Sequence, residues 1–246
     1  MITVYDLGPS KFPEHVGGSV HTRKVIFSLN YKKLPFKVST ITWGEIERTA
    51  KSIGAPPTTT HPDGSPKYTA PFIYDSSTGK SISDSLLIVE YLDKAYPTTP
   101  KLVPDGTRVL QAVFADAVTA KFYSLTSVFR PKFPEWFSPE FLAEIEKLVG
   151  PPKLLSQEET REVWSNGKKS FDELLGAYES AGAGKFVMGG DTPVFADLAL
   201  AALFSGVKIM FGDESEEWKD VSGWIGGRVG KVVEGILKHE RVYSDE

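Results

Sequence analysis

Near residue 100 this chain of 246 residues changes its pattern, from short segments of alternating type to helical spacing almost throughout. Before that point the runs Ile2–Tyr5 and Phe36–Ile41 are typical of strands, and helical spacing covers Val20–Lys33 and Trp43–Ile53. A polar connection, Thr58–Lys67, follows. A chain of this length can bury a core in each of two modest domains. The change of pattern therefore predicts a mixed α/β domain followed by a helical one.

The first part closes with a predicted hairpin and a helix. The strand-like runs Pro71–Tyr74 and Lys80–Ser83 flank the turn Asp75–Gly79. The helix Leu86–Tyr96 follows and stops before Pro97. The order βαβα-ββα predicts a mixed four-stranded sheet with helices packed on it.

After a linker at Thr98–Pro104 the apolar residues follow helical spacing. The predicted helices are Arg108–Phe129, Glu140–Val149, Gln157–Ser180, Phe195–Phe211 and Trp218–Leu237. We therefore expect two domains, residues 1–98 and residues 105–246.

The chain contains no cysteine, although its hydrophobic content of 41% is that of an ordinary globular protein. This absence excludes disulfides, thiolate metal sites, CxxC redox chemistry and a cysteine nucleophile. Any thiol chemistry must therefore use a thiol from outside the chain.

The formal net charge is -4, and no basic patch stands out, so nucleic acid is not expected as a partner. The first hundred residues are slightly basic and the remainder is acidic, which favours the first part for holding a small anion. The start, Met1–Asp6, lacks the features of a signal peptide, and no run approaches the ~18 apolar residues of a membrane span. We expect a cytoplasmic protein without a membrane partner.

Pro71 stands at the start of a strand, where it removes one hydrogen-bond donor. If the Ala70–Pro71 bond is cis, the backbone of Ala70 turns outward and can pair with an extended peptide ligand. The alternative is a trans proline that only begins the strand.

The run Ser83-Asp84-Ser85 precedes the helix Leu86–Tyr96. Free N–H groups at a helix start favour an anion, Ser85 can donate to a carboxylate, and Asp84 can accept from an ammonium group. These residues suit the α-amino acid end of a ligand. The alternative is simple N-capping.

Ser19 follows Gly17-Gly18 at the start of the first helix. There a hydroxyl can donate to a bound thiolate and help to lower its pKa, or it can simply cap the helix. A serine hydrolase is disfavoured, because no G-x-S-x-G run is present. The histidines available as a base are His15, His21, His61 and His239.

These segments together resemble the soluble glutathione transferases, over nearly the whole chain. The resemblance is strongest to their serine-type, etherase-related fungal class (FuA), in which a Ser-Pro-Asn-Thr-Trp-Lys-like run opens the first helix. Here the run is Ser19-Val-His-Thr-Arg-Lys24, so Ser19, Thr22 and Lys24 match, whereas Val20, His21 and Arg23 depart. Further similar runs are Lys51–Pro57, Pro62–Pro66, Tyr68–Pro71, Ser83–Ser85 and Glu90–Asp93.

The resemblance implies a thioredoxin-like N-terminal domain that binds glutathione and an all-helical C-terminal domain that completes the substrate site. It implies a cis Pro71, with Ala70 bonding the cysteinyl part of glutathione, and Asp84 and Ser85 receiving its γ-glutamyl end. Ser19 becomes the implied thiol activator. Glutathione is the implied co-substrate, with no metal, and the family leads us to expect a homodimer.

The second substrate is expected to be an electrophile, conjugated in detoxification. Aromatic side chains could form its wall, which suits a polyphenol or an aryl ether, although each could equally be ordinary packing. The candidates are Phe12, Phe122, Tyr123, Phe129 and Arg130, with Phe133, Trp136 and Phe211 beside them.

Three alternatives stay open. Tyr5, late in the first strand, could replace Ser19 as the activating hydroxyl. The protein could be a non-catalytic carrier of aromatic compounds that keeps a glutathione site. It could also be an interaction module without glutathione, which the presence of Ser19, Pro71 and Asp84 disfavours.

One helix start departs from the family, which carries a Ser/Thr-x-x-Asp capping box there. In Asp191–Asp197 the residue three before Asp197 is Val194, which has no hydroxyl. We expect Asp197 to reach back to a backbone N–H, and the missing hydroxyl to cost about 1 kcal/mol.

Overall fold

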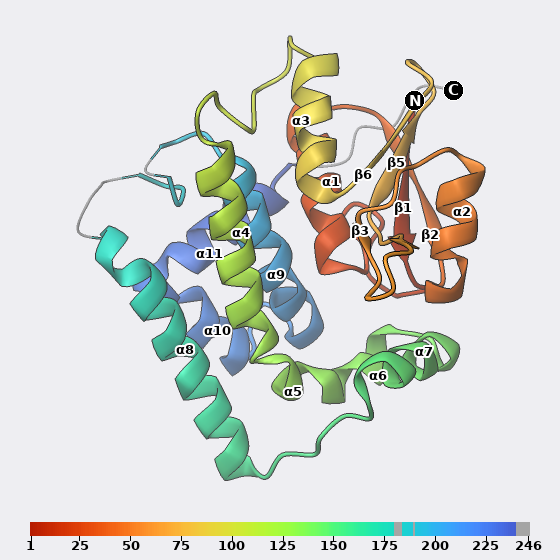
Figure 1. The fold of residues 1–246 in the computed structure, drawn as a ribbon. Coiled ribbons are helices and arrows are strands. Elements are labelled where there is room, and N and C mark those ends of the chain that lie inside the picture. The colour runs from red at the N-terminus through yellow and green to blue at the C-terminus, as the bar shows by residue number, and fades with distance from the viewer. Residues whose placement is uncertain (180–183, 189, 240–246) are drawn as a thin grey trace. The chain divides into compact units, whose positions relative to one another are not determined.

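A computed structural model describes residues 1–179, 184–188 and 190–239 (Figure 1). The described chain forms two compact units, one of Met1–Val103 with His239 and one of Pro104–Lys238. The predicted functional domains, residues 1–98 and 105–246, stay predictions.

The first unit is built on a four-stranded sheet in the order β2-β1-β5-β6. Its strands are β1 (Ile2–Leu7), β2 (Phe36–Ile41), β5 (Phe72–Asp75) and β6 (Lys80–Ser83). Strand β1 is parallel to β2 and antiparallel to β5, and β5 is antiparallel to β6, so the sheet is mixed as predicted. The polar connection contains a small hairpin that the sequence analysis missed, β3 (Thr59–Thr60) with β4 (Pro66–Lys67).

Helices cover both faces of this sheet. Helices α1 (Val20–Lys32) and α3 (Ser85–Ala95) lie on one face, and η1 (Trp43–Glu45) with α2 (Ile46–Ser52) lies on the other (Figure 1). From Ile2 to Asp6 of β1, buried residues alternate with half-buried ones, because successive side chains point to opposite faces. One end of α1 is joined to α3 by an ion pair of 2.6 Å between Lys32 and Asp93, both almost fully buried.

The second unit is helical throughout its described length. Its elements are α4 (Arg108–Tyr123), α5 (Thr126–Phe129), η2 (Arg130–Lys132), α6 (Phe133–Trp136), α7 (Pro139–Val149), α8 (Gln157–Glu179), α9 (Phe195–Phe211), α10 (Glu216–Ser222) and α11 (Trp224–Leu237). Helix α9 is buried on every side from Phe195 to Val207, as expected for a central helix. It packs against α4, α10 and α11. Ser180, the predicted end of α8, lies outside the described residues.

Two predicted helices were wrong in extent. The segment predicted as one helix over Arg108–Phe129 is broken at Ser124 and Leu125, whose amides bond carbonyls three residues back, as in a tighter turn. Leu125 is fully buried there and packs against Gly167 of α8. The segment predicted over Trp218–Leu237 is also divided, and α11 contains positive φ angles at 225–227.

Candidate functional site

The end of β1, the start of β5 and the end of β6 meet at one end of the sheet of the first unit. Tyr5 of β1 is paired with Phe72 of β5, and Phe72 is paired with Ser83 of β6. The residues one position beyond this row are Asp6, Pro71 and Asp84. Because paired residues of neighbouring strands lie side by side, the row brings these three positions together.

The Ala70–Pro71 peptide bond is cis, as the resemblance implied. Ala70 is half-buried, and among the described residues its N–H and C=O have no hydrogen-bond partner. The carbonyl of Pro71 accepts the N–H of Asp84 at 3.3 Å, which ties the two segments together. Ala70 therefore offers one donor and one acceptor at this end of the sheet.

Asp84 is exposed and caps helix α3, as one of the two readings of this run expected. Its Oδ1 accepts the N–H groups of Leu86 and Leu87 at 2.9 and 3.1 Å, and neither bond uses Oδ2. Its φ is +75°, which is uncommon for a residue other than glycine and is frequent at functional sites. Ser85 follows at the first position of the helix and is 6% exposed. Capping thus leaves Asp84 able to accept from a ligand as well.

Ser19 caps helix α1, where its Oγ accepts the N–H of His21 at 3.2 Å. The side chain is partly exposed, and this hydrogen bond leaves the hydroxyl proton available for donation. Burial, together with the charge of Lys24, lowers the pKa of His21 to about 4. His21 is therefore neutral near pH 7, and it does not supply a positive charge beside Ser19.

Two buried charged residues beside Ser19 were missed by the sequence analysis. The carboxylate of Asp6 accepts the N–H groups of Gly18 and Ser19, and the guanidinium of Arg23 donates to the carbonyls of Gly17 and Gly18. The available signals were an acidic residue at the end of a strand and an Arg one turn after Ser19. Neither signal separates a buried charge from a surface one.

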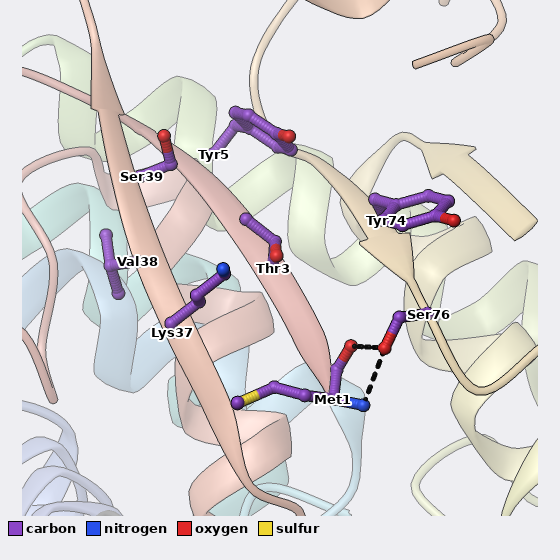
Figure 2. Close-up of a pocket in the computed structure, with 8 residues that line it drawn as sticks. All are labelled: Met1, Thr3, Tyr5, Lys37, Val38, Ser39, Tyr74 and Ser76. Carbon is purple, nitrogen blue, oxygen red and sulfur yellow. Dashed lines mark hydrogen bonds between the residues drawn. The ribbon is translucent and has the colours of Figure 1, made fainter. Parts of the chain in front are cut away.

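Tyr5 lies on the face of the sheet opposite to Asp6, because adjacent side chains of a strand alternate. Its ring stacks on Phe72 with centroids 4.8 Å apart. Burial and the neighbouring Tyr74 raise the pKa of Tyr5, the opposite of what a phenolate activator needs. A pocket of about 620 Å³ opens on this face (Figure 2). It is lined by Met1, Thr3, Tyr5, Lys37, Val38, Ser39, Tyr74 and Ser76.

The aromatic candidates for the second substrate fall in both units. In the first unit Phe12 is 7% exposed, and its ring lies 4.3 Å from the guanidinium carbon of Arg23. In the second unit Phe122 and Phe129 are buried and stack on each other with centroids 5.3 Å apart. These three side chains are thus packed within their own units.

The remaining candidates are more accessible. Tyr123 is 50% exposed, and Phe133, Trp136 and Phe211 are half-buried. Arg130 donates to the carbonyls of Gly150 and Pro151 at the end of α7. Tyr123 is therefore the most exposed of the aromatic candidates.

Within the described ranges, no group of three or more His, Asp or Glu side chains is arranged to hold a metal ion. Within the same ranges, the helices are too short or too polar to cross a membrane.

Comparison with known families matches both parts of the chain. A family model described as the N-terminal domain of glutathione S-transferase matches residues 15–100, and one described as the C-terminal domain matches residues 109–239. The chain belongs to the glutathione S-transferase family. Its thioredoxin-like first domain with a mixed four-stranded sheet, followed by a helical domain, is the fold of that family.

Solved structures and a curated relative agree with this assignment. A glutathione S-transferase of Ceriporiopsis subvermispora, CsGST63524, is 31% identical with a TM-score of 0.85, covering 100% of this chain and 99% of that one. GSTFuA3 of Phanerochaete chrysosporium is 30% identical with a TM-score of 0.83, covering 99% and 98%. The probable glutathione S-transferase GSTU1 of Oryza sativa subsp. japonica is 28% identical over 181 residues, 68% of each chain. The similarity to GSTFuA3 agrees with the expected FuA-like class.

Proposed function

We propose that this protein is a serine-type glutathione transferase that conjugates the thiolate of glutathione to electrophilic aromatic compounds in detoxification. The observation that supports the proposal is the row Tyr5–Phe72–Ser83, beyond which Asp6, Pro71 and Asp84 lie at one end of the sheet. The N–H of Ser19 donates to Asp6 there. CsGST63524, with the same fold, was solved in complex with glutathione. No cysteine is present, so the reactive sulfur comes from glutathione.

Glutathione would bind along the segments that follow this row. The N–H and C=O of Ala70 pair with the cysteinyl backbone as an added strand would. Asp84 accepts from the γ-glutamyl ammonium group, and Ser85 with the start of α3 faces the γ-glutamyl carboxylate. The slightly basic character of the first hundred residues suits an anionic tripeptide.

Ser19 is proposed to stabilise the thiolate. Its Oγ accepts the His21 N–H, which polarises the hydroxyl and leaves its proton for the sulfur. A free thiol has a pKa of about 8.5, and donors at a helix start lower it. After the thiol proton passes to solvent, the sulfur forms a bond to the electrophilic carbon. With a substrate such as an aryl ether, the leaving group departs with the bonding electron pair.

For the electrophile we propose an aromatic or polyphenolic compound. In the second unit Tyr123 offers the most exposed ring, with Phe122, Phe129 and the cation Arg130 proposed beside it; in the first unit the proposed contact is Phe12. We also propose a cytoplasmic homodimer. The exposed apolar side chains Val109, Leu110 and Val113 of α4 support a protein interface.

Substitution of Ser19 tests this function. We expect Ser19→Ala to lower the rate of thioether formation with chlorodinitrobenzene by roughly tenfold or more, since a hydrogen bond to a charged group contributes about 1.5–3 kcal/mol. Ser19→Thr keeps both the cap and the hydroxyl, so it should retain most of the rate. Ser19→Asp keeps a cap without a proton to donate, and it should lose the rate while preserving helix stability.

A thermal shift with millimolar glutathione should survive in Ser19→Ala. A rate unchanged by this substitution would remove Ser19 from catalysis. No thermal shift in the wild-type protein would favour the interaction module.

A second candidate function is a carrier of aromatic compounds, and the pocket beside Tyr5 favours it. Tyr5 and Tyr74 offer rings, and Lys37 offers an ammonium group for a phenolate or sulfonate. The probe is anilinonaphthalene sulfonate, whose binding should weaken in Tyr74→Ala and Lys37→Ala. Binding of aromatic compounds together with glutathione, but without thioether product, would favour the carrier over the enzyme.

A further inference from the structure

The two peptide groups that precede Ser19 are each held at both ends by a charged side chain. In the Gly17–Gly18 peptide, the carbonyl accepts from Arg23 Nε at 2.9 Å and the N–H donates to Asp6 Oδ2 at 2.6 Å. In the Gly18–Ser19 peptide, the carbonyl accepts from Arg23 Nη2 at 3.3 Å and the N–H donates to Asp6 Oδ1 at 3.2 Å. Asp6 thus binds the N–H groups of both peptides, and Arg23 binds their carbonyl oxygens.

Both charged side chains are buried. Asp6 is 4% exposed and Arg23 is 2% exposed. Burial lowers the pKa of Arg23 to about 10, against the attraction of Asp6, so the guanidinium stays charged near pH 7. Burial also raises the pKa of Asp6, while the amides of Gly18, Ser19 and Leu7 oppose this rise. Burying two charges is costly unless their hydrogen bonds are satisfied, and here two bonds from each charged group go to one short loop.

The loop has little room to adopt another path. Gly17 has a φ of +87°, and a Cβ there would lie 2.7 Å from Ile26 Cδ1. A Cβ on Gly18 would lie 2.8 Å from the carbonyl of Leu7 and from the hydroxyl of Ser10. On its other side the Arg23 guanidinium is covered by the ring of Phe12. Packing and hydrogen bonds therefore select the same loop geometry.

We infer that Asp6 and Arg23 are positioning residues of the transferase reaction, which fix the direction of the Ser19 hydroxyl through the two peptide groups that they hold. The inference rests on the proposed role of Ser19. Neither side chain needs to touch glutathione. A small displacement of a catalytic group can lower the rate up to about a hundredfold. A loop whose peptide groups are fixed by hydrogen bonds at both ends keeps the Ser19 hydroxyl in place and so preserves the rate.

The test uses two variants that keep the size of the side chain or its charge. Asp6→Asn places an NH₂ group where one carboxylate oxygen accepts, and Arg23→Lys keeps the cation but cannot donate from two nitrogens in a planar fork. For both we expect kcat with chlorodinitrobenzene to fall about tenfold, with KM for glutathione within about twofold. The apparent pKa of the bound thiol, followed by thiolate absorbance, should rise by about one unit.

A double-mutant cycle then shows whether Asp6 acts through Ser19. In the Ser19→Ala background, Asp6→Asn should lower kcat by less than about twofold, because the hydroxyl that it positions is already gone. A further tenfold loss in that background would overturn the inference.

The matched control is Asp75→Asn in the same unit. Asp75 is fully buried and accepts from the hydroxyls of Tyr91 and Tyr96, each at 2.6 Å. This control should lower the melting temperature without changing the pH profile. If Asp6→Asn and Arg23→Lys behave like the control, their role is structural and the inference is wrong. Should Asp6→Asn fail to fold, Arg23→Lys still decides the question.

Two kinds of failure are distinguishable. If Ser19→Ala shifts the thiol titration and the Asp6 and Arg23 variants do not, the proposed function stands and only the positioning role fails. If Ser19→Ala itself leaves rate and titration unchanged, the role of Ser19 fails, and the positioning role fails with it.

Discussion

Each unit of the chain contains a buried carboxylate that holds backbone amides. In the first unit Asp6 holds the N–H groups of Gly18 and Ser19. In the second unit Asp197, fully buried at the start of α9, holds the N–H groups of Val187 and Val194 at 2.6 and 2.9 Å. The same residue type therefore fixes a loop in one unit and a helix start in the other.

The two carboxylates differ in the cation that accompanies them. Arg23 binds the same peptide groups as Asp6, whereas Arg228, which lowers the pKa of Asp197 only weakly, donates to the carbonyl of Phe186. Burial raises the pKa of both carboxylates despite their amide partners, that of Asp197 to about 6. The cation therefore separates the two sites by what it binds: Arg23 holds the same loop as Asp6 beside the proposed site, whereas Arg228 holds a different carbonyl. The raised pKa of Asp197 makes that carboxylate a source of pH-dependent stability.

The largest effect is expected from removing the carboxylate of the second unit. Asp197→Ala leaves the amides of Val187 and Val194 without their acceptor, at about 1–3 kcal/mol for each buried group. We expect a loss of about 4 kcal/mol of unfolding free energy, measured by urea denaturation. The control is Asp213→Ala, which removes an exposed carboxylate paired with Lys208 and should cost less than about 1 kcal/mol. Equal losses in the two variants would contradict the role of Asp197.

The pH dependence of stability follows from the raised pKa of Asp197. The native state holds this proton more tightly than the unfolded state, whose carboxyl titrates near 4. The stabilisation is therefore complete below about pH 4 and is lost as pH rises through about 6. A rise of about two units corresponds to about 3 kcal/mol.

Other groups also titrate in this range, so the quantity to measure is a difference. The unfolding free energy of the wild-type protein minus that of Asp197→Asn, which cannot ionise, should fall by about 3 kcal/mol as the pH rises from about 3 to about 7. A constant difference across this range would show that Asp197 keeps an ordinary pKa.

The smallest effect concerns the cap of α9. The structure confirms that this helix begins at Phe195, and that Asp197 accepts the N–H of Val194 without a hydroxyl in return. Val194→Ser should add about 1 kcal/mol and raise the melting temperature by roughly 2–4 °C. Val194→Ala, which lacks both the hydroxyl and the isopropyl group, is the control. A melting temperature of Val194→Ser no higher than that of Val194→Ala would show that a hydroxyl at this position does not stabilise the helix start.

The strands that contain Tyr5, Phe72 and Ser83, and the hairpin that joins the last two, could be predicted from local sequence patterns. The pairing of Tyr5 with Phe72 could not, because it joins segments far apart in the chain. The hydrogen bonds of Asp6 and Arg23 to the loop before Ser19 could not be predicted from sequence, since burial of a charged side chain is decided by tertiary packing. The break at Leu125 was missed because helical spacing continues across it. Strands β3 and β4, of two residues each, are too short to show a period.

The ultraviolet titration of glutathione bound to the wild-type protein measures whether Ser19 lowers the pKa of the bound thiol. With Ser19 held beside the sulfur, the bound thiol should titrate about one unit or more below free glutathione measured under the same conditions. In Ser19→Ala the titration should return towards that of the free thiol. A bound thiol that titrates like free glutathione in the wild-type protein would show that Ser19 does not stabilise the thiolate.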